Sequence, residues 1–293
     1  MCVSPTLRLA IACVVVRAAA QGAPCPPTAD LGREIRLSSE LRRMNVSLFV
    51  GSLSGPDDRS AARRAEMRAR CRCAYQRAGI RSRFYVGAPM PKRPAQLRAT
   101  TDEIAAVKRV VAEAEAEGDI VPVWGWERYQ DLNKKVARIF EDGVATGADF
   151  VAKVDDDTCL RPRRLLRTLR DWRRTRKPGA ELYLGRYLFK GTEYEAMRGA
   201  DGTIAPFQSG TAVVLSANLA RTIFDVDRLY TTFFQPYGTS FDDANLGKWV
   251  QRAERVHGLA VDKVAQHGIG VDLAKTEGPL PLGDEVVRRK ATG

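Results

Sequence analysis

The sequence predicts an α/β fold, in which a mainly parallel β-sheet carries helices on both faces of a single domain. Short apolar segments typical of strands alternate with longer segments of helical periodicity from residue 47 onward. The strand that begins at Phe150 ends in three consecutive carboxylates, Asp155–Asp157, and open α/β sheets place their ligands at the carboxyl ends of strands. The 293 residues, 44% hydrophobic and 28% charged, have the composition of an ordinary globular protein.

The elements follow one another as repeated β-α-β units, which favours parallel strands joined by crossover helices. Strands are predicted at 47–52, 82–86, 120–123 and from Phe150, with helices at 60–78, 102–117 and 128–146. Gly118 ends the second of these helices. The pattern after Asp157 is less regular, with apolar segments at 182–187 and 210–215, a helix from about Ala217 and a helix that ends near Ala253.

The amino terminus has the features of a targeting segment. Leu9–Val16 is an apolar stretch of the length found in signal peptides, and it is too short for an ordinary membrane-spanning helix. We expect a signal peptide or short signal-anchor at 1–23, a linker or stem at 24–44, the folded domain at 45–285 and a tail at 286–293. The chain is therefore expected in the secretory pathway, with possible anchoring to a membrane through its amino terminus.

The chain carries a formal net charge of +12, which favours anionic partners without choosing among them. Much of the excess lies in Arg161–Lys177, where leucines at helical spacing leave the arginines on the other face. We interpret this segment as a solvated amphipathic helix and expect no nucleic-acid partner, because no nucleic-acid motif accompanies it. The six cysteines match no zinc pattern and are interpreted as structural or paired thiols.

The run Asp155–Asp157 predicts a cation site. Carboxylates this close repel one another, so a positive charge is expected between them. Mg²⁺ and Mn²⁺ prefer oxygen ligands and leave positions open for phosphate, so a divalent cation that holds a diphosphate fits this run. The alternative is a solvated acidic turn with no ligand.

Several further segments, in order along the chain, resemble the β1,3-galactosyl- and N-acetylglucosaminyltransferases of glycosyltransferase family 31. The matching segments are Arg63–Cys71, Gly118–Ile120, Tyr129–Lys135, Phe150–Asp157, Ser209–Ser216 and Phe241–Gly247. Each match is weak alone, and their ordered combination is specific. Cys71 stands where the family usually has Trp, Gln208 where it usually has a cysteine, and Val213 where it usually has an aromatic residue. The family's usual disulfide at position 208 is therefore expected to be absent.

The resemblance implies a GT-A-type fold and an inverting, metal-dependent transfer of galactose or N-acetylglucosamine from a UDP-sugar to a glycan or glycoprotein hydroxyl. It further implies a β1,3 linkage and a Golgi location. A catalytically inactive, lectin-like relative and a metal-dependent phosphohydrolase are the alternatives. A phosphohydrolase usually recruits several dispersed histidine and aspartate ligands, and this chain has only two histidines.

The resemblance also implies roles for individual residues. The metal ligands would be Asp155, Asp157 and His267, with His257 the alternative histidine, and the cation would be Mn²⁺ or Mg²⁺. The residues expected to bind the nucleotide-sugar are Arg64, Arg68, Lys135, Lys153, Asp155 and Asp156. A lysine inside a strand as apolar as 150–155 needs an anionic neighbour, which singles out Lys153.

One general base is enough for direct displacement at the anomeric carbon, because the metal-bound diphosphate leaves from the opposite face. Asp243 matches the family's base position, and Asp242 is the second choice. The alternative is that both residues cap the helix that follows, a common role of Asp. A side chain can have both roles.

Overall fold

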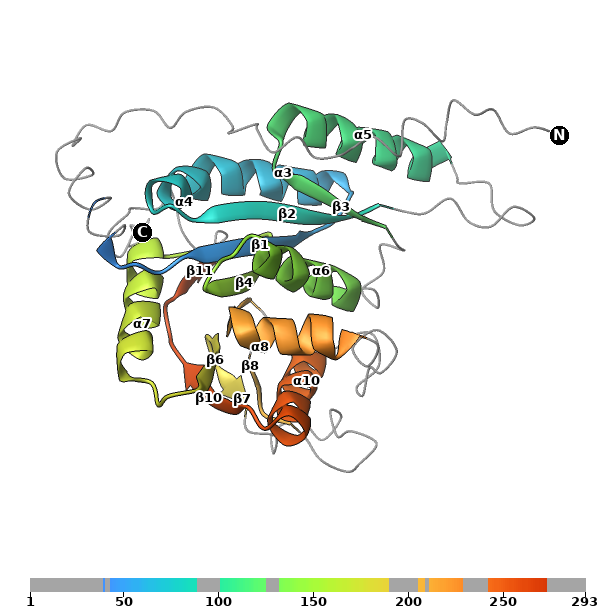
Figure 1. The fold of residues 1–293 in the computed structure, drawn as a ribbon. Coiled ribbons are helices and arrows are strands. Elements are labelled where there is room, and N and C mark those ends of the chain that lie inside the picture. The colour runs from blue at the N-terminus through green and yellow to red at the C-terminus, as the bar shows by residue number, and fades with distance from the viewer. Residues whose placement is uncertain are drawn as a thin grey trace, which may run out of the picture.

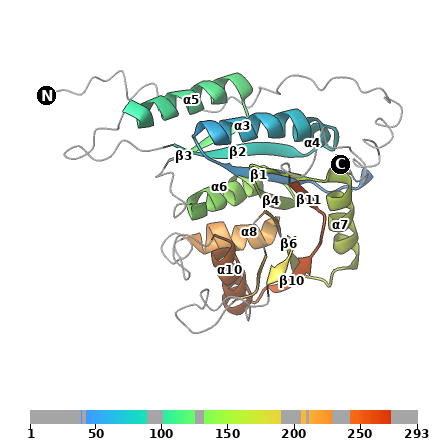
Figure 2. The same ribbon diagram turned by 180° about the vertical axis from the view of Figure 1, so that it is seen from behind.

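The computed structural model describes residues 39, 43–88, 101–124, 132–189, 205–208, 211–228 and 242–272. These residues form a central β-sheet with helices on both faces (Figures 1 and 2). The sheet follows the order β10-β6-β9-β4-β1-β2-β3, and every neighbouring pair is parallel except those of β9 with β4 and β6. The predicted α/β fold with a mainly parallel sheet is therefore confirmed.

The strands of this sheet are β1 (Leu48–Ser54), β2 (Arg81–Ala88), β3 (Ile120–Trp124), β4 (Phe150–Asp155), β6 (Ala180–Gly185), β9 (Ala212–Ser216) and β10 (Ala260–Ala265). Two short antiparallel pairs lie outside it. They join β5 (Thr158–Leu160) to β11 (Gly270–Asp272) and β7 (Leu188–Phe189) to β8 (Phe207–Gln208).

Side chains alternate between two hydrophobic clusters, one on each face of the sheet, as the period of a strand requires. The first cluster packs under α3 (Asp58–Met67), the π-helix η1 (Arg68–Arg72), α4 (Cys73–Arg77), α5 (Thr101–Glu117) and α7 (Pro162–Thr175). The second packs under α6 (Leu132–Ala145), α8 (Ala217–Arg221), the π-helix η4 (Thr222–Val226) and α10 (Asp242–His257). Both faces are thus covered, which suits the near-continuous apolar strands.

Helix α6 lies unusually close to the centre of the sheet. A Cβ atom added at Gly51 of β1 would come within 2.4 Å of the Ile139 side chain, and one added at Gly143 of α6 would come within 2.5 Å of Val151. Glycine at both positions therefore allows the backbones to approach. This close packing brings Lys135, in the first turn of α6, to the carboxyl end of β1.

The structure refines several predicted elements. The helix expected at 60–78 is divided by η1, and α7 confirms the amphipathic helix expected within Arg161–Lys177. The strands that were not predicted are β5, β7, β8, β10 and β11. Expectations that fall on residues 1–38, 128–131, 209–210, 241 and 286–293 lie outside the described residues. Within the described part of the chain, no helix combines the length and apolar character needed to span a membrane.

The interpretation of the cysteines as paired is confirmed for three of them. Cys71 of η1 forms a disulfide with Cys159 of β5, with the two Cα atoms 6.0 Å apart and a sequence separation of 88. A loop of this length corresponds to about 4–5 kcal/mol in the chain-entropy model of disulfide stabilisation. Cys73 is also disulfide-bonded. Cys2, Cys13 and Cys25 lie outside the described residues.

Candidate active site

The carboxyl edge of the parallel strands gathers most of the residues singled out from the sequence. Strand β1 ends at Ser54, and β4 ends at Asp155, the first residue of the turn that leads into β5. We call Asp155–Asp157 the acidic turn. Helix α10 begins beside it with Asp242 and Asp243 in its first turn. The acidic turn and the first turn of α10, which are far apart in sequence, therefore bring carboxylates to one place, beside the end of β1.

Lys153 is the centre of this group. Its side chain is only 3% exposed, and its Nζ lies 3.0 Å from Asp242 Oδ2, 3.3 Å from Asp155 Oδ1 and 3.6 Å from Asp243 Oδ1. Burial alone would lower the pKa of Lys153, but the carboxylates of Asp155, Asp242 and Asp243 raise it well above its ordinary value. The ammonium therefore stays charged and holds β4 and α10 together.

Among the described residues, these three carboxylates share the ammonium of Lys153, and one positive charge does not balance three negative charges. Burial raises the pKa of Asp155, and the charges of Asp242 and Asp157 raise it further, against the opposing effect of Lys153. Burial, with the charges of Asp242 and Asp155, also raises the pKa of Asp243 to about 7. A site with this excess of negative charge favours the binding of a further cation.

The three side chains of the acidic turn differ in access to solvent. Asp155 and Asp157 are 39% and 38% exposed, whereas Asp156 between them is 8% exposed. Asp156 accepts hydrogen bonds from Ser54 Oγ at 2.8 Å and Arg63 Nη1 at 3.0 Å. Two open carboxylates that flank a fixed one are hard oxygen donors, so the residues present fit a divalent cation whose other ligands come from phosphate and water.

Arg63 is a site residue that the sequence analysis did not assign. In addition to its bond with Asp156, its Nη2 lies 3.7 Å from Asp157 Oδ2, and its side chain is 35% exposed. Burial would lower the pKa of Arg63, but Asp156 and Asp157 raise it. The sequence contains Arg63 and Arg64 side by side, but adjacent residues of a helix point about 100° apart. The sequence alone did not show which of the two side chains faces the carboxyl edge of the sheet.

Arg64 and Arg68 are held in ion pairs. Arg64 is 1% exposed, donates to both carboxylate oxygens of Glu113 and reaches Ser54 Oγ at 2.9 Å. Arg68 makes a bidentate contact with Asp119 at 2.7 and 2.9 Å and lies over the Phe84 ring. Their expected role in binding the nucleotide-sugar stays a prediction, and in this structure their guanidinium groups connect α3 and η1 to α5 and to Asp119.

Lys135 reaches the same edge from α6. Its side chain is buried, and its Nζ donates to the carbonyl oxygen of Ser54 at 2.9 Å. The end of β1 is therefore contacted by Lys135 from one face of the sheet and by Arg64 from the other. These contacts hold Ser54, whose hydroxyl donates to Asp156.

The contacts of the two histidines are with other side chains, and the expected role of His267 as a metal ligand stays a prediction. His267 lies edge-on against Tyr187, with ring centroids 4.7 Å apart, and His257 lies 3.0 Å from Asp227 at the end of α10. Among the described residues, no three His, Cys, Asp or Glu side chains form a group that could hold a metal ion. Asp155 and Asp157 therefore offer a divalent cation a pair of carboxylates, whose remaining ligands would come from outside this pair.

Gln208 occupies the position where the resemblance has a cysteine. It is fully buried, and its Nε2 donates to the carbonyl oxygens of Val264 at 3.0 Å and Tyr183 at 3.3 Å. An amide therefore makes this connection between β8, β6 and β10. Val213, the other departure, is buried on β9 directly opposite Lys153 in the sheet register.

A comparison with protein families agrees with this geometry. The family model described as Galactosyltransferase matches residues 59–257, more than half of the chain, from α3 through the end of α10. The match includes Arg63, the acidic turn and the first turn of α10, whereas His267 lies beyond it. A search of the curated proteins finds no match. The chain belongs to the galactosyltransferase family, as its resemblance to family 31 indicated, and the family supports a glycosyltransferase role.

Proposed function

We propose that this protein is an inverting, metal-dependent enzyme that transfers galactose or N-acetylglucosamine from a UDP-sugar to a hydroxyl of a glycan or glycoprotein, forming a β1,3 linkage. The observation that carries the proposal is the group of Asp155, Asp242 and Asp243 around Lys153, which lies within the segment matched to the family. We place this activity in the secretory pathway, in the Golgi lumen.

The acidic turn would hold the cation. Asp155 and Asp157 are the ligands that we assign to Mn²⁺ or Mg²⁺, because both carboxylates are open to solvent at the carboxyl edge. When bound, such a cation stabilises the negative charge that develops on a departing diphosphate. Arg63 borders the acidic turn from α3 and presents a partly exposed guanidinium, a group suited to phosphate oxygens.

Asp243 is the better of the two candidates for the general base. Its side chain is 27% exposed and lies 3.6 Å from Lys153, whereas Asp242 is 9% exposed and lies 3.0 Å from the same ammonium. Because a base works best when its pKa is near the working pH, the raised pKa of Asp243, about 7, suits proton removal from an acceptor hydroxyl. Asp242 would orient Lys153 and hold the first turn of α10.

A donor screen tests the proposal. The protein would be incubated with Mn²⁺, a panel of UDP-sugars and candidate glycan acceptors, and released UDP would be measured with and without acceptor. We expect acceptor-stimulated release from UDP-galactose or UDP-N-acetylglucosamine. A protein that binds glycans but releases no UDP from any donor would instead be lectin-like, and release of phosphate in place of UDP would indicate a phosphohydrolase.

A further inference from the structure

The position of the acidic turn depends on the strand that follows it. The strand before it, β4, is fixed between β9 and β1 in the middle of the sheet. The strand after it, β5, leaves the sheet, and all three of its residues are buried. The separation of Asp155 from Asp157 therefore depends on where β5 is attached.

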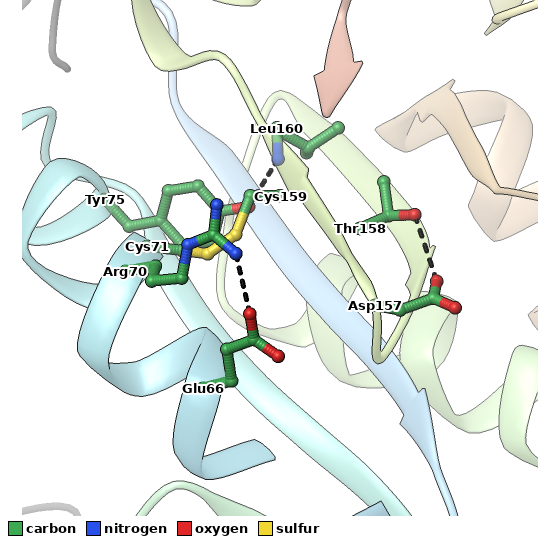
Figure 3. The surroundings of a disulfide bond; sticks show 8 residues. All are labelled: Glu66, Arg70, Cys71, Tyr75, Asp157, Thr158, Cys159 and Leu160. Atoms are coloured by element: carbon green, nitrogen blue, oxygen red, sulfur yellow. Dashed lines mark hydrogen bonds and ion pairs between the residues drawn. A yellow bond between two sulfur atoms is a disulfide. The ribbon is translucent and has the colours of Figure 1, made fainter. Parts of the chain in front are cut away.

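Two consecutive residues of β5 are attached to the same helical segment. Cys159 is bonded to Cys71 of η1, and the Leu160 backbone N–H donates to the hydroxyl of Tyr75, in α4, at 2.7 Å. Figure 3 shows Asp157 at the turn, directly before this attachment. Cys71 and Tyr75 are four residues apart, so they lie on one face of the helical segment.

The same helical segment also contacts the acids themselves. Arg63, two turns before Cys71, reaches Asp156 and Asp157. The segment from α3 to α4 therefore contacts the acidic turn at its carboxylates and anchors the strand directly behind it. Three carboxylates in sequence repel one another, so the turn needs such external support to keep its outer side chains together.

We propose that the Cys71–Cys159 disulfide and the Tyr75 hydroxyl are positioning elements that hold the acidic turn in its cation-binding arrangement. The proposal rests on the proposed function for the identity of the cation. Groups that orient metal ligands without touching the metal typically contribute about 10–100-fold to metal affinity. We assign a contribution of this size to the attachment of β5.

The test compares Cys71→Ala/Cys159→Ala with Cys73→Ala as the matched control. Cys73 is disulfide-bonded two residues after Cys71, but its bond does not involve Cys159, so the control removes a disulfide from the same segment and keeps the covalent link between η1 and β5. Hydrogen exchange of the amides of the acidic turn would be measured without metal. Mn²⁺ affinity would then be measured by electron paramagnetic resonance, without any donor.

We expect faster exchange at residues 155–160 and a Mn²⁺ affinity about 10-fold or more lower in the double variant, with neither change in Cys73→Ala. If the double variant does not fold, the same two measurements on Tyr75→Phe test the proposal. This variant keeps the disulfide and removes only the hydroxyl that accepts from the Leu160 N–H. It should show the same changes to a smaller degree.

Unchanged exchange and Mn²⁺ affinity in folded variants would overturn the proposal and leave the disulfide as a stabilising bond alone. The exchange measurement needs neither metal nor donor. A native protein that transfers no sugar would therefore contradict the proposed function while the exchange result still decides the role of the disulfide.

Discussion

Two charged clusters in this protein lie on opposite faces of the sheet and differ in their balance. On the α3 side, Arg64, Arg68 and Arg72 meet the carboxylates of Glu113, Glu117 and Asp119 in a network of short ion pairs. On the α10 side, within the part of the chain that the structure describes, the ammonium of Lys153 faces the three carboxylates of Asp155, Asp242 and Asp243. We call these the balanced cluster and the acidic cluster.

The pKa shifts follow the balance of charge. Burial would raise the pKa of Glu113 in the balanced cluster, but hydrogen bonds from Arg64 and Arg68 lower it below its ordinary value. Burial raises the pKa of Asp155 and Asp243 in the acidic cluster, and the neighbouring carboxylates add to the effect. A buried ion-pair network in which positive and negative charges balance has a structural role. A buried cluster with more carboxylates than cationic groups favours the binding of a cationic ligand. The following predictions test this contrast, from the largest effect to the smallest.

Removal of the cation should have the largest effect. Chelation should reduce transfer to background, and added Mn²⁺ should restore it, because the acidic cluster cannot stabilise a departing diphosphate without a cation. Asp157→Ala should lose activity in the same assay while its melting temperature stays near that of the native protein, because Asp157 is partly exposed. Full transfer in excess chelator would contradict the assignment.

Replacement of the proposed general base should have the second largest effect. Asp243→Asn keeps the size and some capping ability of the residue, and we expect turnover to fall by about 10²–10⁴-fold with donor affinity retained. Asp242→Asn is the control and should lower turnover less. The native kcat/KM should fall on acidification at a pH well above the ordinary range of aspartate, because the pKa of Asp243 is raised to about 7. If only Asp242→Asn lost turnover, the base would be Asp242.

Substitutions of Arg68 and Arg63 should affect different quantities, the free energy of unfolding for Arg68 and the donor KM for Arg63. Arg68→Met removes one of the two guanidinium partners of both Asp119 and Glu113, which keep Arg72 and Arg64, and it should lower the free energy of unfolding by about 1–3 kcal/mol, with the donor KM of the folded enzyme unchanged. Arg63→Met should raise the donor KM with a smaller effect on stability, because Arg63 is partly exposed. Urea denaturation and steady-state kinetics measure the two quantities. A raised donor KM in folded Arg68→Met would instead support its predicted role at the nucleotide.

The smallest expected effect is that the contributions of Asp243 and Glu113 to stability change with pH in opposite directions. Asp243 has a folded pKa raised from 3.8 to about 7, so its contribution to stability is present below about pH 4 and is lost as the pH rises through 7. Glu113 has a lowered pKa, so its contribution is present above about pH 4.5 and is lost as the pH falls further. Asp243→Asn should therefore stabilise the fold at pH 8 by about 1–2 kcal/mol, whereas Glu113→Gln should destabilise it. Urea denaturation at pH 8 and pH 4 measures both, and a destabilised Asp243→Asn at pH 8 would contradict the pKa assignment.

Local sequence predicted the elements whose signals are local. Apolar segments of strand length, helical periodicity and Gly118 placed most strands and helices, and the order of the motifs indicated the family. The strands β10 and β11 were not predicted, because neither has a strong apolar pattern. β10 is a partly exposed edge strand, and β11 has only three residues. The π-helix η1 was also not predicted, because no local sequence pattern marks the extra residue in its turn.

For the candidate site, the sequence by itself determined the residue types and their place at the end of a strand. Three consecutive carboxylates after an apolar strand, and a lysine inside that strand, already required a cationic partner and an anionic neighbour. Only the tertiary structure decided the pairings. It selected Asp242 and Asp243, about 90 residues away, as partners of Lys153, turned Arg63 toward the acidic turn and Arg64 toward Glu113, and joined Cys71 to Cys159. Such pairings depend on how helices pack across a sheet, and the spacing of residues along a chain does not specify that packing.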